Sequence, residues 1–163
     1  MKKLLTLSVL ALSLSCNALA ETPSLVEDGL RAYMKDGASA AVTVWFRGSA
    51  IENDKNQRLN TLSFLAQLEA GYGAVESYEM VATFSPTSRL RRVYAICYYA
   101  KGPAYMCFDL YNSSSGWIIC LYNINPKPLE VFPRELLERM PNHSPDPTPA
   151  PGMSPAGQES RHG

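Results

Sequence analysis

The chain has 163 residues, of which 46% are hydrophobic, 10% aromatic and 18% charged. Its 15 basic residues balance 15 acidic ones, so the composition lacks the basic surface with which a general nucleic-acid binder neutralises phosphates. These values are typical of a globular protein, and they exclude a disordered chain, a collagen and a disulfide-dense miniprotein.

The first 20 residues have the pattern of an export signal. Lys2 and Lys3 precede an apolar run over residues 4–14, and the segment ends in Ala18-Leu19-Ala20, where small residues suit signal peptidase. The run is too short to span a bilayer core of about 30 Å. We therefore expect residues 1–20 to be a signal peptide, the protein to be periplasmic or secreted by a bacterium, and no integral membrane segment to remain after cleavage.

Two alternatives apply to this segment. It could be a buried N-terminal helix, or Cys16 could carry a lipid. A bacterial lipoprotein signal usually has Leu three positions before the cysteine, whereas here Leu14 lies two positions before it.

At the other end of the chain, residues 141–163 hold six of the twelve prolines and no aromatic or branched aliphatic residue, so we expect a disordered Pro-rich tail. Residues 21–140 remain as a single α+β domain.

Helices are expected in the first half of this domain. Ser24 and Glu27 form a capping box, and apolar residues at helical spacing follow until Gly37. A second short helix is expected over residues 38–47, although its β-branched and aromatic residues would equally suit a strand. A third helix, capped by Asn53 or Asp54, has leucines at steps of three and four and ends at Gly71 or Gly73.

The second half changes to a strand pattern. Eight of the nine tyrosines lie between residues 72 and 122, beside many Val, Ile and Phe residues. We expect strands at about 74–84, 89–100, 104–112 and 117–124. The short polar connections between them can join only antiparallel neighbours. A final short helix is expected over residues 134–140, after Pro133. The predicted fold is α+β, with N-terminal helices packed on a four-stranded antiparallel sheet.

Alternation along the strands assigns each side chain to one face of the sheet. The expected helix-facing set is Tyr78, Met80 and Phe84 in the first strand, Tyr94, Ile96 and Tyr98 in the second, and Met106, Phe108 and Leu110 in the third, all meeting Leu59, Leu62 and Leu65. The expected outer set is Val93, Cys97, Tyr99, Tyr105, Cys107, Asp109 and Tyr111. This outer face is too apolar for one that meets only water. We therefore expect a homodimer or partner interface there, formed by Tyr99, Tyr105 and Tyr111.

The motifs of this half resemble a known superfamily. Tyr72-Gly73, Tyr99-Ala-Lys101-Gly102-Pro103, Phe108-Asp-Leu-Tyr111 and Gly116-Trp117 resemble small exported bacterial proteins of the cystatin-like, nuclear-transport-factor-2-like superfamily. The resemblance covers roughly residues 24–125. It implies a cone of helices against a curved four-stranded sheet, often dimeric and in some members enclosing a small-molecule pocket. The chain departs from this pattern at Cys107, where a basic residue is more usual.

Histidine chemistry is excluded from the predicted domain. His143 and His162 are the only histidines, and both lie in the predicted tail, so histidine triads, Cys-His dyads and His-rich zinc sites are not expected. We expect no metal and no cofactor. An enzyme of isomerase or hydrolase type without histidine would need Asp with Tyr, which is an argument from fold analogy alone.

Three cysteines follow the predicted signal peptide, and none has Cys-x-x-Cys spacing. If Ala100 pairs with Ala104 around the turn, Cys97 lies directly opposite Cys107, within disulfide range. A Cys97–Cys107 bridge is then expected in an oxidising compartment, whereas Cys120 is expected to be a buried core thiol. A register slip of one residue would place Cys97 and Cys107 on opposite faces and exclude the bridge.

The sequence thus predicts an exported, non-catalytic α+β domain that binds a periplasmic protein partner or itself through the outer sheet face. The alternative is a small-molecule binder with an aromatic pocket between helices and sheet, lined by Tyr78, Tyr94, Tyr98 and Trp117. An enzyme of isomerase or hydrolase type without histidine is the third candidate function.

Overall fold

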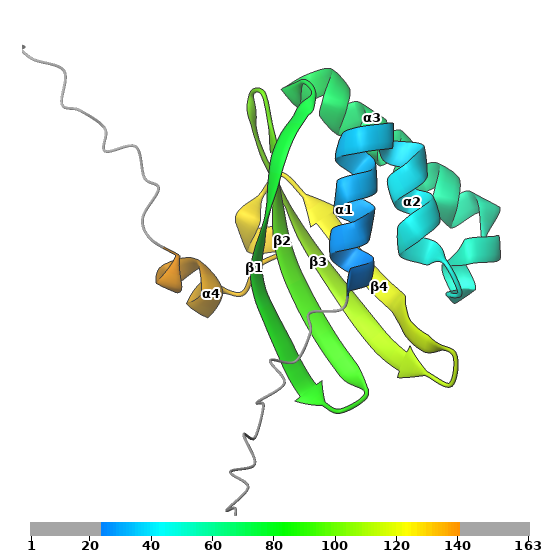
Figure 1. Ribbon diagram of the computed structural model, residues 1–163. Coiled ribbons are helices and arrows are strands. Elements are labelled where there is room, and N and C mark those ends of the chain that lie inside the picture. The colour runs from blue at the N-terminus through cyan, green and yellow to red at the C-terminus, as the bar shows by residue number, and fades with distance from the viewer. Residues whose placement is uncertain (1–23, 141–163) are drawn as a thin grey trace, which may run out of the picture. The chain divides into compact units, whose positions relative to one another are not determined.

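The computed structural model describes residues 24–140 (Figure 1). The predicted signal peptide and the Pro-rich tail lie outside the described residues. The described chain forms one compact unit up to Phe132, and a second unit begins at Pro133. The second unit contributes one described helix, α4 (Arg134–Arg139). Within residues 24–140, no helix combines the length and apolar character needed to cross a membrane.

Three helices precede the sheet: α1 (Ser24–Asp36), α2 (Ala38–Phe46) and α3 (Lys55–Tyr72), with the short 3-10 helix η1 (Ala50–Asn53) before α3. The first helix ends before Gly37, whose φ of 82° favours glycine. Asp54 caps α3, because its Oδ1 accepts hydrogen bonds from the backbone N–H groups of Asn56 and Gln57, both at 3.0 Å.

The segment that suited either a helix or a strand is helical. Its buried residues are Ala41, Val42, Trp45 and Phe46, which recur at helical rather than alternating spacing. A strand would have turned half of them towards water. Tertiary burial therefore decides the state of α2, against the β preference of its branched side chains.

The sheet is an antiparallel meander of β1 (Val75–Thr87), β2 (Leu90–Tyr99), β3 (Gly102–Ser113) and β4 (Gly116–Asn125), in the spatial order β1-β2-β3-β4. Figure 1 shows the strands curving beneath the three helices, which all cover the same face. The predicted α+β class, with N-terminal helices on a curved four-stranded antiparallel sheet, is confirmed.

The core lies between the helices and one face of the sheet. Trp45 is central: its indole N–H donates to the carbonyl of Val26 at 3.1 Å, and its ring centroid lies 5.2 Å from that of Phe108. Gly29 makes this approach possible, since a Cβ at that position would lie 2.0 Å from Trp45 Nε1. Helices α1 and α2 therefore pack at this point without room for one more carbon atom.

The prediction of which β2 side chains face the helices is wrong. In the structure Val93, Ala95, Cys97 and Tyr99 point into the helix-side core, so Tyr94, Ile96 and Tyr98 lie on the outer face. The cause is the register: Cys97 pairs with Ala104 and Tyr99 with Gly102, a shift of three residues from the expected pairing. An odd shift moves every side chain of a strand to the other face. The tight turn of Ala100 and Lys101 sets this register.

Two further core assignments are wrong. A register shift between Met80 and Ala82 makes Phe84 a neighbour of Arg92 on the outer face, because a bulge reverses the alternation beyond it. Leu59 is 60% exposed on the solvent side of α3. The other expected core residues of α3, β1 and β3 belong to the helix-side core or pack against it: Leu62, Leu65, Tyr78, Met80, Met106, Phe108 and Leu110.

Candidate functional site

The four residues expected to line a small-molecule pocket do not meet in the structure. Tyr94 and Tyr98 lie on the outer face, as a consequence of the β2 register. Tyr78 and Trp117 pack against the helix-side core, but they belong to β1 and β4, the two opposite edges of the sheet. Each has its own neighbour: Tyr78 donates to Glu27 at 3.4 Å, and the Arg91 guanidinium lies 4.7 Å from the Trp117 ring centroid.

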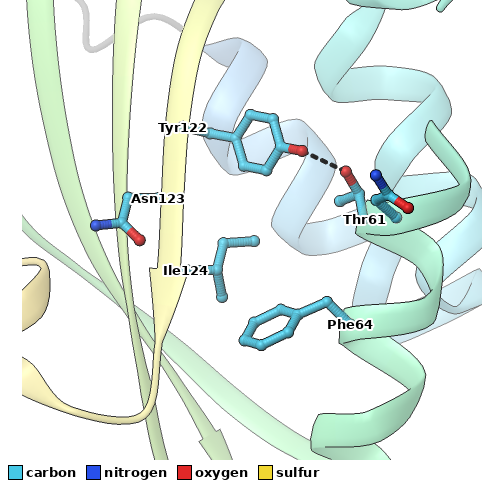
Figure 2. A pocket seen from close by; sticks show the side chains of 6 residues that line it. Thr61, Phe64, Tyr122, Asn123 and Ile124 are labelled. Carbon is cyan, nitrogen blue, oxygen red and sulfur yellow. Dashed lines mark hydrogen bonds between the residues drawn. The ribbon is translucent and has the colours of Figure 1, made fainter. Parts of the chain in front are cut away.

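A different pocket lies between α3 and β4, which we call the α3–β4 groove. Its volume is about 270 Å³. It is lined by Asn60, Thr61 and Phe64 from α3 and by Tyr122, Asn123 and Ile124 from β4. Figure 2 shows the Phe64 side chain of α3 extending towards Ile124 of β4, and the hydroxyl groups of Thr61 and Tyr122 joined by a hydrogen bond between the same two elements.

Hydrogen bonds orient the polar groups of this groove. The Thr61 hydroxyl donates to the carbonyl of Gln57 at 2.8 Å. A hydroxyl has one proton to donate, so Tyr122 is the donor in the 2.5 Å bond between the Tyr122 and Thr61 hydroxyls. This bond holds the Tyr122 ring in place. The polar groups of the lining are amides and hydroxyls, and none of the six lining residues carries a carboxylate, amine, guanidinium, thiol or imidazole group.

The outer sheet face carries a row of four aromatic rings, the outer aromatic row. It runs from Phe84 of β1 to Tyr94 of β2, Phe132 and Tyr105 of β3, with successive ring centroids 5.9, 5.2 and 5.2 Å apart. Phe132 reaches this row because the chain turns back after β4 through η2 (Pro128–Glu130). The Asn123 amide donates to the carbonyl of Glu130 at 2.7 Å and thereby anchors the turn.

Large apolar side chains remain exposed around this row. Phe84 is 46% exposed, Leu90 42% and Leu121 60%. The strand register places all three on the outer face. Beside them, Arg92 and Asp109 form a two-pronged ion pair, with Nε–Oδ1 at 2.6 Å and Nη2–Oδ2 at 2.7 Å. The hydrogen-bonded carboxylate raises the pKa of the Arg92 guanidinium above its usual value, so the guanidinium stays charged.

The expected interface residues divide between the two faces. Tyr105 and Tyr111 lie on the outer face, where the Arg89 guanidinium lies 4.8 Å from the Tyr111 ring centroid. The predicted outer-face position of Tyr99 is wrong. Tyr99 is buried in the helix-side core, and its hydroxyl lies 3.2 Å from that of Tyr33. Burial raises the pKa of both phenols, so this pair remains protonated.

The expected Cys97–Cys107 bridge is also wrong. Cys107 pairs with Tyr94 rather than with Cys97, and the two thiols lie on opposite faces of the sheet; all three described cysteines are free. Burial raises the pKa of Cys97 to about 12 and that of Cys107 to about 11, so neither is a thiolate at neutral pH. Cys120, expected in the core, is exposed at a bulge of β4.

Sequence reasoning missed the α3–β4 groove altogether. Thr61 offered one signal, a hydroxyl among the apolar positions of α3, but its partner Tyr122 is 61 residues away. No pattern along the chain places α3 beside β4. Among residues 24–140, no group of three or more Cys, His, Asp or Glu side chains is placed to hold a metal ion.

Comparison with known proteins finds similarity to solved structures at low sequence identity. No family model and no curated protein matches the chain. A crystal structure of a Campylobacter jejuni protein described as an NTF2-like transpeptidase is 10% identical, with a TM-score of 0.45, and covers 60% of this chain and 95% of that one. The intermembrane-space region of the chloroplast protein ARC6 is 12% identical, with a TM-score of 0.34, and covers 64% and 90%. The α+β arrangement of this chain is the one that its resemblance to the nuclear-transport-factor-2-like superfamily implied.

Proposed function

We propose that this protein is an exported, non-catalytic domain that self-associates through its outer sheet face. The observation that carries the proposal is the exposure of three large apolar side chains, Phe84, Leu90 and Leu121, on the face that carries the outer aromatic row. Contiguous apolar surface rimmed by polar groups commonly marks a protein interface. Aromatic residues and Arg are also the types enriched in such interfaces.

The charges of this face favour a second copy of the chain as the occupant. Arg89 lies at the hairpin between β1 and β2, where its guanidinium lies over the Tyr111 ring, whereas Glu79 lies further along β1 and accepts a hydrogen bond from the Tyr98 hydroxyl at 3.0 Å. A two-fold axis parallel to the sheet and perpendicular to its strands would bring the Arg89 end of one protomer against the Glu79 end of the other. A two-fold interface must be complementary to itself in this way.

The chemistry of the candidate sites supports binding rather than catalysis. The outer thiol of Cys107 is protonated, and Arg92 and Asp109 satisfy one another. The α3–β4 groove has no ionisable group other than the Tyr122 phenol, which is a donor to Thr61. None of these arrangements pairs an activated nucleophile with a base, as catalysis requires.

Sedimentation equilibrium of the full chain tests the proposal. We expect a species of twice the 18.0 kDa chain mass that dissociates in the Leu121→Glu variant, because a charge would be buried at the interface. Leu59→Glu is the matched control, since Leu59 is equally exposed but lies on α3. A monomeric parent chain, or equal dissociation of both variants, would contradict self-association through the outer face.

Export is tested separately by expressing the whole sequence in a bacterium. We expect the protein in the periplasmic or extracellular fraction to have lost residues 1–20, so that mass spectrometry finds Glu21 at its N-terminus. Recovery of the uncut chain from the cytoplasm would contradict export. A lipid mass attached to Cys16 would instead favour the lipoprotein alternative.

A further inference from the structure

We infer that β4 and the α3–β4 groove form a docking site for an extended, uncharged peptide segment of a partner protein. The segment adds to β4 as a fifth strand and inserts one large apolar side chain between Phe64, Tyr122 and Ile124. The groove lining does not include Phe84, Leu90 or Leu121, so the inference does not rest on the proposed self-association.

The first support is the open edge of β4. This strand spans ten residues and pairs with β3 on one side only; within residues 24–140, no segment pairs with its other side. An edge strand presents unpaired backbone N–H and C=O groups. These groups specify an occupant with an extended backbone, the mode known as strand addition.

The second support is the contrast with β1, the other edge of the sheet. β1 carries Glu76, Glu79 and Pro86, and its pairing with β2 is interrupted by three register shifts. Charges, proline and bulges are the devices by which proteins block unwanted edge pairing. β4 has neither a charged residue nor a proline, and its single register shift lies beside Asp109. Only β4 is therefore left competent to accept another strand.

The third support is the size of the neighbouring pocket. Free small-molecule ligands occupy pockets of about 300–1,000 Å³, whereas the α3–β4 groove measures about 270 Å³. A groove at the lower limit of that range has room for one large apolar side chain. Side chains of an added strand alternate between the two faces, so one of them would point towards α3 at this level.

The chemistry of the groove describes the occupant. Its lining has amide, hydroxyl and apolar groups but no ion, so a charged side chain would be desolvated without a partner. The segment 141–163 of this chain is unsuitable, because its six prolines lack the N–H groups that a sheet ladder needs. A second β4 is also unsuitable, since its helix-facing residues already pack into their own core: Trp117, Ile119, Tyr122 and Ile124.

Strand addition is tested with a blocked heptapeptide, Thr-Val-Thr-Phe-Thr-Val-Thr, and two N-methylated forms, by NMR on the full chain. One form is methylated at the odd-numbered amides and the other at the even-numbered amides, so that only one of them blocks the hydrogen bonds to β4. We expect the parent peptide to slow amide exchange in β4 at least tenfold. One methylated form should bind at least tenfold more weakly than the other, and replacing Phe by Ala should also weaken binding tenfold or more.

Variants locate the site. Asn60→Arg should weaken binding at least tenfold, because the new side chain fills the groove. Ser63→Arg, a change to another exposed α3 residue outside the lining, should bind as the parent does. Leu90→Glu, on the outer face of β2 and outside β4, should also retain binding, which separates this site from the outer-face interface.

Several results would overturn the inference. These are no protection of β4 at millimolar peptide, equal affinity of the two methylated forms, or protection of β1 instead. Protection of β4 that depends on protein concentration without peptide would identify a second copy as the occupant, and it would overturn the inference as well.

Discussion

The two faces of the sheet are built from the same four strands but are covered in different ways. On the helix face, Phe108 is fully buried and contacts Trp45, and the buried hydroxyls of Tyr33 and Tyr99 are paired with each other. The outer face is closed only in part, by Phe132, and leaves large apolar residues exposed. The comparison indicates that folding stability resides mainly on the helix face, whereas the outer face is available for association.

The largest expected difference between the faces comes from truncating one aromatic ring on each. Phe108→Ala should lower the free energy of unfolding by about 3–5 kcal/mol, because it leaves a cavity in a close-packed core. Tyr105→Ala should cost less than half as much, since Tyr105 is only half-buried and its main ring contact is Phe132. Urea unfolding of both variants measures this difference. Equal losses would contradict the assignment of stability to the helix face.

Glycine substitutions measure how tightly the helix layer packs. Gly29→Ala should destabilise the protein by about 1–3 kcal/mol, although alanine is the better helix former, because the added Cβ would collide with the Trp45 indole. Gly71→Ala is the matched control: it also lies in a helix, and a Cβ there meets nothing within 4 Å. Thermal unfolding should show Gly71→Ala to be neutral or stabilising. If both changes were tolerated, the helix layer would be looser than described.

Alkaline pH should weaken the fold through one thiol on each face. The pKa values of Cys97 and Cys107 are raised by burial from 9.0 to about 12 and about 11. Their protonated forms therefore stabilise the folded state fully below pH 9, and this contribution is lost progressively as pH rises towards those values. Between pH 8 and pH 10 each thiol should cost roughly 1 kcal/mol. Cys97→Ala and Cys107→Ala should each reduce the pH dependence of urea unfolding, and an unchanged dependence would contradict the burial of that thiol.

The smallest effect is expected from the ion pair on the outer face. Asp109→Asn should change the free energy of unfolding by at most about 1 kcal/mol, because the Arg92 side chain is 49% exposed and exposed pairs contribute little. Urea unfolding at low and high salt checks this value. A decrease in the free energy of unfolding of more than about 2 kcal/mol would mean that the ion pair is more deeply buried than its exposure indicates.

The fold was predictable because its signals are local. The capping box at Ser24, the leucines of α3 and the tyrosine-rich second half each predicted an element that the structure contains. Glycine and polar turns marked the connections, and short connections permit only antiparallel neighbours. Local signals could not decide whether α2 is a helix or a strand, since its residues suit both.

Face assignments failed where alternation carried no information. In β2 the five residues from Val93 to Cys97 are all buried, so hydrophobicity along the strand does not distinguish the helix face from the outer face. The turn between β2 and β3 has two residues instead of the expected three, so each side chain of β2 points to the opposite face from the one expected. Tyr99 and Cys97 consequently entered the core, and the expected Cys97–Cys107 bridge became impossible.

Composition and spacing alone were enough to establish the helices, the meander and the absence of histidine from residues 21–140, because those properties depend on neighbours a few positions apart. The register of β2, the bulge that turns Phe84 outward and the meeting of Thr61 with Tyr122 depend on segments that are distant along the chain. Such contacts form only when the whole core closes, and it is these contacts that create both the outer aromatic row and the α3–β4 groove.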